Sequence, residues 1–233
     1  MKLLCLTLFY WTLTSSIAWS QLPELDPDHL GLDAARLDRI DQVAAEGIDS
    51  GNMAGCVVAV GRQGGVGFLR AYGHRQVEPS TEPMTVDTVF DLASITKPVA
   101  TATSIMHLLQ QGKIQLRAAA ADYLPEFGQN GKEEITIEQL LTHQGGLIPD
   151  NALEDYRHGT EEAWRRIYAL TPRTEPGTEF IYTDVGYLVL GEVVRSVSGK
   201  AVDQFAAEHT FRPLGMQETG YNPSPELQRR AAA

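Results

Sequence analysis

Apolar residues recur at helical spacing along most of the chain after residue 33. The first helix is predicted after Asp33, which can cap it, and its apolar positions are Leu37, Ile40, Val43, Ala44 and Ile48. Further helices are predicted at about 94–111, from Thr136, from Thr160, from Asp184 to a stop at Gly199, and at about 201–209. Thr136 and Gln139 have the spacing of a capping box. The pattern therefore predicts that helices dominate after residue 94.

Two segments that precede these helices have the composition of strands. GCVVAVGR (55–62) and GVGFLRAYG (65–73) are separated by a glycine-containing turn, which predicts a β-hairpin. A phosphate loop is the other reading of these glycines, but no Lys-Ser or Lys-Thr pair follows them. Strands followed by a run of helices predict an α+β fold, because a parallel sheet would need strands and helices to alternate.

The first twenty residues have a different character from the rest of the chain. MKLLCLTLFYWTLTSSIAWS begins with a lysine, continues with an apolar stretch and ends with small residues at the spacing of a signal-peptidase site. We interpret residues 1–20 as a cleaved export signal, which implies a periplasmic or secreted protein without stable membrane insertion. The alternative is an uncleaved membrane anchor, because the apolar stretch from Leu3 to Trp19 is long for a signal.

Composition and charge narrow the class of protein. The chain has 233 residues, of which 43% are hydrophobic, and this is enough for one domain with a sizeable core. A net charge of −11 without a basic block argues against nucleic acid as a partner. Cys56 lies in an apolar run, which predicts a buried, inert thiol. The six histidines show no metal-ligand spacing, so we predict neither a metal nor another cofactor.

The segment Ser94-Ile95-Thr96-Lys97 carries the candidate chemistry. A spacing of three residues places Ser94 and Lys97 one helical turn apart on the same face. A serine becomes a nucleophile when a neighbouring base accepts its proton, and a lysine can be that base if its pKa is lowered. Taken alone, the motif favours a serine that caps a helix and a lysine that points into solvent.

Five blocks of sequence resemble the serine β-lactamase-related family, which contains class C β-lactamases, D-Ala-D-Ala carboxypeptidases and related esterases. The blocks are TVFDLASITKPVATATSIMHLLQQGKIQL (88–116), YLPEF (123–127), ITIEQLLTHQGGL (135–147), PGTEFIYTDVGYLVLGEVV (176–194) and RPLGM (212–216). The resemblance implies a β-lactamase/transpeptidase-like α+β fold, with an antiparallel sheet beside a helical domain. We expect an N-terminal segment at 21–33, the family domain at 34–222 and a C-terminal tail at 223–233.

The resemblance also assigns roles to individual residues. It implies that Ser94 is the acylated nucleophile, that Lys97 is its partner and that Tyr182 moves the proton between the serine and the leaving group. A tyrosine can do this if positive charge nearby, here Lys97, favours its phenolate. Whether Lys97 or Tyr182 is the general base stays open. His143, in the block LLTHQGGL, is expected to fix the loop after a short helix rather than to take part in catalysis.

Asp184 departs from the family pattern, in which asparagine is the commoner residue. An asparagine amide can donate a hydrogen bond to a substrate carbonyl, whereas an ionised carboxylate only accepts. A carboxylate here would also raise the pKa of Lys97, which opposes a role as a neutral base. Our hypothesis is that Asp184 binds substrate and favours esters or other acyl substrates over β-lactams and peptide amides; the alternative is that Asp184 caps the helix that follows it.

The family has a third motif, Lys or His followed by Thr or Ser and then Gly, which has no counterpart after Tyr182 in this sequence. That motif lies on a strand that supplies an oxyanion-hole donor. We therefore expect the chain to be a fragment that lacks the C-terminal strands, or a truncated product with weak activity. The predicted function is hydrolysis of an ester, peptide or β-lactam acyl substrate, and the alternative is a non-catalytic protein that binds cell-wall peptide or a similar ligand.

Overall fold

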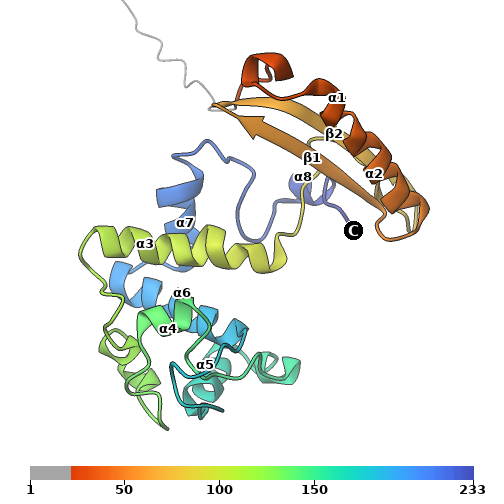
Figure 1. Ribbon diagram of the computed structural model, residues 1–233. Coiled ribbons are helices and arrows are strands. Elements are labelled where there is room, and N and C mark those ends of the chain that lie inside the picture. Colours follow the sequence, from red (N-terminus) through yellow and green to blue (C-terminus); the bar gives the residue numbers. More distant parts are fainter. Residues whose placement is uncertain (1–21) are drawn as a thin grey trace, which may run out of the picture.

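A computed structural model describes residues 22–233, so the interpretation of residues 1–20 as a signal or anchor lies outside the described residues. Its first part is a hairpin of β1 (Gly55–Arg62) and β2 (Gly65–Gln76), to which the short strand β3 (Glu82–Pro83) pairs at the far edge of β2. All pairs are antiparallel, in the order β1-β2-β3. Helices α1 (Ala34–Leu37) and α2 (Arg39–Asp49) lie along the hairpin (Figure 1).

The remainder of the chain is helical. A short helical turn at Ala93–Ile95 continues through a wider turn at Lys97–Ala102 into α3 (Thr103–Gln110). There follow α4 (Ile137–Leu141), α5 (Thr160–Ala169), α6 (Asp184–Ser198), α7 (Val202–Ala206), a further wide turn at Ala207–Phe211 and α8 (Pro225–Gln228). Figure 1 shows α3 between the hairpin on one side and α4, α5 and α6 on the other. Strands followed by helices confirm the predicted α+β class.

The main hydrophobic core lies among the helices, and α6 runs through its centre. One face of α6 contributes Val185, Val189, Leu190, Val193 and Val194, each of which is 0% exposed. The core residues Ile105, Leu108, Ile137, Leu140 and Phe127 pack around this face from α3, α4 and the turn Pro125–Phe127. Burial of a continuous apolar face is what holds a helix of this length in place.

A buried lysine joins two loops of the helical part. Lys132 is 0% exposed, and its Nζ donates to the carbonyl oxygens of Gln129 (2.7 Å), Tyr168 (3.0 Å) and Leu170. Burial lowers the pKa of Lys132. Because the three donors of an ammonium meet three carbonyls, the loop at 129–135 is tied to the end of α5.

Several predicted element ends are confirmed, and two predictions are wrong. Asp33 and Thr136 cap their helices, Thr136 within the expected capping box, and Gly199 ends α6 in a left-handed conformation. Asp184, however, lies in the first turn of α6, and Thr183 caps that helix by accepting from the backbone N–H of Gly186. Cys56 is a free thiol that is partly exposed rather than buried, because β1 is an edge strand of the described sheet and no residue of β1 is fully buried.

The chain returns to the hairpin at its C-terminal end. Val89 donates from its backbone N–H to the carbonyl of Arg230 (2.9 Å) and accepts from the N–H of Ala232 (2.8 Å). The guanidinium of Arg230 donates to the Asp87 carbonyl at 2.9 Å. These bonds tie the end of the chain to the segment that leads into the turn at Ala93–Ile95. In the part from residue 22 onward, no helix has the length and apolar character needed to span a membrane.

Candidate active site

Ser94 stands at the start of the helical run that leads into α3. The residue before it, Ala93, has φ of +43°, a left-handed conformation that is uncommon for a residue with a Cβ. The backbone N–H of Ala93 donates to Oδ1 of Asp91 at 2.8 Å, which stabilises this bend. Ser94 therefore projects from a strained turn and is exposed, inside the first helical turn rather than at a capping position.

Lys97 connects Ser94 with the start of α6. Its Nζ donates to Oγ of Ser94 at 3.0 Å and forms an ion pair with Oδ1 of Asp184 at 2.5 Å. The Lys97 side chain is 12% exposed. Lys97 therefore does not point into solvent, as the alternative interpretation of the motif expects. Oδ1 of Asp184 is shielded from solvent, and its polar contact is the Lys97 ammonium.

Tyr182 completes the group around Lys97. The Nζ atom of Lys97 lies 4.8 Å from the centre of the Tyr182 ring. Hydrogen bonding to Lys97 is the largest influence on the pKa of Tyr182, which is lowered from its ordinary value of 10.0, and hydrogen bonding to Ser94 lowers it further. Tyr182 is 46% exposed, so its ring is accessible to a ligand.

The electrostatics of Lys97 separate the two candidate bases. Burial alone lowers the pKa of Lys97, but hydrogen bonding to Asp184 and then to Tyr182 outweighs it, and the pKa rises above 10.5. Lys97 is therefore an ammonium ion near neutral pH, while the pKa of Tyr182 is lowered. An ammonium can donate a hydrogen bond to Ser94 Oγ but cannot accept its proton, whereas a phenolate can.

The loop at 143–149 holds the segment that carries Tyr182. The N–H groups of Arg173, Gly177 and Ile181 donate to the carbonyls of Gly146 (2.8 Å), Gln144 (2.7 Å) and His143 (2.9 Å). Gly146 has φ of +73°, and a Cβ there would lie 2.3 Å from the carbonyl oxygen of Thr174, so the loop requires glycine. The predicted role of His143 in fixing this loop agrees with these contacts.

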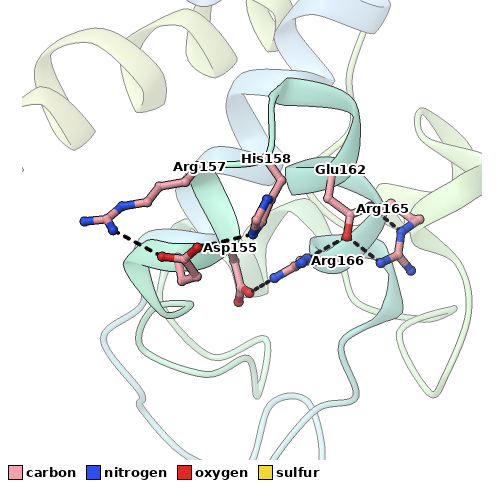
Figure 2. A network of polar contacts seen from close by, with 7 residues as sticks. Asp155, Arg157, His158, Glu162, Arg165 and Arg166 are labelled. Atoms are coloured by element: carbon pink, nitrogen blue, oxygen red, sulfur yellow. Dashed lines mark hydrogen bonds and ion pairs between the residues drawn. The ribbon is translucent and has the colours of Figure 1, made fainter.

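A cavity of about 530 Å³ opens beside the Lys97–Asp184 pair. Its walls include the aromatic residues Tyr156, Trp164, Tyr187 and Tyr221. An ion-pair network holds two of these walls together, because Arg166 bridges Asp155, beside Tyr156, and Glu162, on the same helix as Trp164 (Figure 2). A cavity of this size fits a small organic group, and its aromatic walls suit an apolar or ring-containing one.

The structure brings together all four residues that the sequence singled out. Ser94, Lys97, Tyr182 and Asp184 form one cluster, and Lys97 contacts the other three. The sequence did not indicate Tyr187, whose ring centre lies 6.0 Å from Lys97 Nζ and whose hydroxyl donates to the carbonyl of Leu141 at 3.0 Å. Its position five residues after Tyr182 and one helical turn after Asp184 is the signal that could have identified it.

Comparison with known proteins gives a family and several relatives. The model of a family described as Beta-lactamase matches residues 40–233. An N-acetylmuramyl-L-alanine amidase of Bacillus subtilis is 30% identical over 207 residues, which are 81% of this chain and 47% of that protein. An Escherichia coli K12 protein that bears the name of a D-alanyl-D-alanine carboxypeptidase is 28% identical over 90% of this chain and 52% of its own length.

A solved structure shares the arrangement of the elements. EstCE1, described as a hydrolase with promiscuous acyltransferase activity, superposes with a TM-score of 0.72 and 28% sequence identity, over 84% of this chain and 55% of that one. The chain thus spans about half the length of the curated relatives it matches.

Proposed function

The chain belongs to the β-lactamase family, and from this premise we propose that it is a serine hydrolase that forms an acyl-enzyme on Ser94. The observation that carries the proposal is the cluster in which Lys97 lies within 3.0 Å of Ser94 Oγ and against the Tyr182 ring. The family and the relatives described above support an acyl substrate of the ester, peptide or β-lactam kind.

In the proposed reaction Tyr182 is the general base and Lys97 stays protonated. The Tyr182 phenolate accepts the proton of Ser94 Oγ as that oxygen forms a bond to the substrate carbonyl carbon. The bond from this carbon to the leaving group then breaks, and the leaving group takes the proton from Tyr182. Water attacks the acyl-enzyme with the same proton transfers, which releases the acid and restores Ser94.

Lys97 has a supporting role in this scheme. Its ammonium lowers the pKa of Tyr182 and orients Ser94 by a hydrogen bond of 3.0 Å. Asp184 keeps Lys97 charged, because it raises the pKa of that lysine. The sequence left the choice between Lys97 and Tyr182 open, and these charges favour Tyr182.

We further propose that Asp184 directs the site towards esters. A carboxylate accepts hydrogen bonds but donates none, so it cannot hold the carbonyl oxygen of an amide side chain as an asparagine amide can. An ester requires less stabilisation of its leaving group than an amide does, because an alkoxide leaves the acyl carbon more readily than an amide nitrogen. The aromatic cavity beside Asp184 would receive the acyl part of such an ester.

Labelling with a fluorophosphonate probe tests the nucleophile. We expect the wild-type chain to be labelled and Ser94→Ala to be unlabelled, while Ser104→Ala, a buried serine of α3, keeps its label. Labelling that persists in Ser94→Ala would overturn the assignment. A folded wild-type chain that takes no probe, and that instead binds a cell-wall peptide, would support the non-catalytic alternative.

Substrate choice is tested with Asp184→Asn. We expect this variant to gain acylation by a penicillin relative to acylation by a p-nitrophenyl ester, because an amide donor replaces an acceptor. Unchanged rates with both substrates would contradict the role given to Asp184.

Export is a separate proposal that rests on residues 1–20. Expression of the chain in a Gram-negative host should give a periplasmic product that begins near Gln21, as read by intact mass. A product that retains Met1 and sediments with membranes would favour the anchor instead.

A further inference from the structure

His143 contacts the backbone on both sides of Tyr182. Its carbonyl oxygen accepts from the N–H of Ile181 at 2.9 Å, and its Nδ1 accepts from the N–H of Thr183 at 3.1 Å. Nδ1 must therefore be unprotonated, and the ring hydrogen of the neutral form lies on Nε2. Tyr182 is the residue between these two bonds, so one histidine sets its backbone position.

The ring of His143 also packs against the ring of Tyr182. The two ring centres are 4.5 Å apart with an angle of 34° between the planes, and the Tyr187 ring lies 5.1 Å away on the same imidazole. The Phe180 ring meets it edge-on at 5.7 Å. His143 itself has φ of +59°, a conformation that few residues with a Cβ adopt, so the loop is shaped to present this ring.

We propose that neutral His143 is a positioning residue that holds Tyr182 against Lys97, and that protonation of His143 releases Tyr182 and switches the site off in acid. The inference rests on the proposed function, in which Tyr182 is the general base. It adds a residue and a pH limit to that function.

Protonation of His143 would replace the Nδ1 acceptor by a donor in the hydrogen bond with the Thr183 N–H. An imidazolium has a hydrogen on Nδ1, which would face the N–H of Thr183, and two donors repel each other. The charged groups that act on the ring are Lys97 and Asp184, and the titratable groups that pack against it are Tyr182 and Tyr187. The positive charge of the imidazolium would also repel the Lys97 ammonium and so disturb the contacts of that ammonium with Ser94 and Tyr182.

The direction of the titration agrees with the geometry. Burial lowers the pKa of His143 below 6.5, and the charge of Lys97 lowers it further, against the smaller opposing effect of Asp184. His143 is therefore neutral at pH 7 and above. The site should lose activity as the pH falls through the lowered pKa of His143, on the acid side of 6.5.

Two substitutions distinguish the role of the Nδ1 acceptor of His143 from the role of its ring. His143→Asn places an amide oxygen where Nδ1 was, and asparagine tolerates a positive φ, but this variant has neither ring nor titration. His143→Phe keeps a ring but leaves the Thr183 N–H without its acceptor. His209→Asn, at a histidine whose ring packs against His107 and Phe205, is the matched control.

The pH profile of p-nitrophenyl butyrate hydrolysis by the full chain is the first test. Protonation of Tyr182 lowers kcat as the pH falls in every variant, and below the His143 pKa we expect kcat of the wild type and of His209→Asn to fall about tenfold more per pH unit than this effect alone gives. In His143→Asn that additional fall should disappear, with kcat at pH 8 within about tenfold of wild type. In His143→Phe kcat should fall at least about a hundredfold at every pH with little change in KM. An acid fall as steep in His143→Asn as in wild type, or wild-type kcat in His143→Phe, would overturn the proposal.

A second test does not depend on turnover. Long-range 1H–15N spectra should show an unprotonated Nδ1 in His143 at pH 7.5, and ultraviolet titration at 295 nm should show one low-pKa tyrosine that is absent from Tyr182→Phe. That titration should move towards the ordinary tyrosine value in His143→Phe and less in His143→Asn. A protonated Nδ1, or a Tyr182 titration unaffected by either variant, counts against His143 even if the chain proves inactive. Normal spectra without Ser94-dependent turnover would instead refute the proposed function alone.

Discussion

The hairpin part of the molecule and the helical part are packed very differently. Of the buried hydrophobic side chains among residues 22–233, the part before residue 93 holds four, which are Leu30, Ala44, Phe68 and Met84. The helical part holds the continuous core around α6. No residue of β1 is fully buried, although its sequence is almost wholly apolar. The same density of apolar residues therefore produced a core in one part and a half-covered sheet in the other.

This difference bears directly on the candidate site. All four site residues follow residue 93 and so belong to the helical part. The loop at 143–149 and the cap of α6 fix the positions of Tyr182 and Asp184, whereas Ser94 lies exposed at the strained turn that follows the hairpin part in the chain. Support of this kind is what keeps reacting groups aligned.

Paired leucine truncations test the contrast most strongly. Leu190→Ala removes a side chain that is 0% exposed in α6 and should lower the free energy of unfolding by about 2–5 kcal/mol. Leu69→Ala removes a half-buried side chain in β2 and should cost about 1 kcal/mol. Urea unfolding followed by circular dichroism measures both. Equal losses would show that the two parts are equally well packed.

The buried lysine gives the next largest effect. Lys132→Met should lower the free energy of unfolding by about 2–3 kcal/mol, because three carbonyl oxygens lose their donor inside the helical part. Lys113→Met, at an exposed lysine, is the control and should leave thermal unfolding nearly unchanged. A stable Lys132→Met variant would mean that water or a shifted backbone satisfies those carbonyls.

Acid titration should show the smallest effect, with one contributing carboxylate in each part. Hydrogen bonds from Arg165 and Arg166 lower the pKa of Glu162 to about 2, in the network of Figure 2, and Tyr72 and then Arg70 lower the pKa of Asp41 below 3.8. Because both pKa values are lowered on folding, each carboxylate stabilises the protein at neutral pH, and this is lost as the pH falls from about 4.5 towards 2.

The charge-neutral variants Glu162→Gln and Asp41→Asn separate the two contributions. Each variant should unfold at a slightly lower temperature than wild type at pH 7 and should show a flatter decline of that temperature in acid. Differential scanning calorimetry between pH 2 and 7 measures this. Parallel declines in wild type and in both variants would place the acid sensitivity elsewhere.

Elements whose signals are local were predicted well from the sequence. The hairpin at 55–62 and 65–73, the capping box of Thr136 and Gln139 and the stop at Gly199 all depend on residues that are neighbours in the chain. The two wrong predictions concerned which of two neighbouring residues caps a helix and how far distant residues bury a side chain. Thr183 rather than Asp184 caps α6, because Asp184 is drawn to Lys97, and Cys56 stays partly exposed because β1 is an edge strand.

The sequence by itself determined the proximity of Ser94 and Lys97, because a spacing of three residues in a helix is a local constraint. The resemblance of the sequence to the serine β-lactamase-related family added Tyr182 to that pair. Only the tertiary structure decided that Asp184 pairs with Lys97 and that His143 brackets Tyr182. These contacts join residues about 40 or more positions apart in the chain, and helical periodicity contains no information about them. They form because burial of the α6 core brings the ends of distant loops to one place.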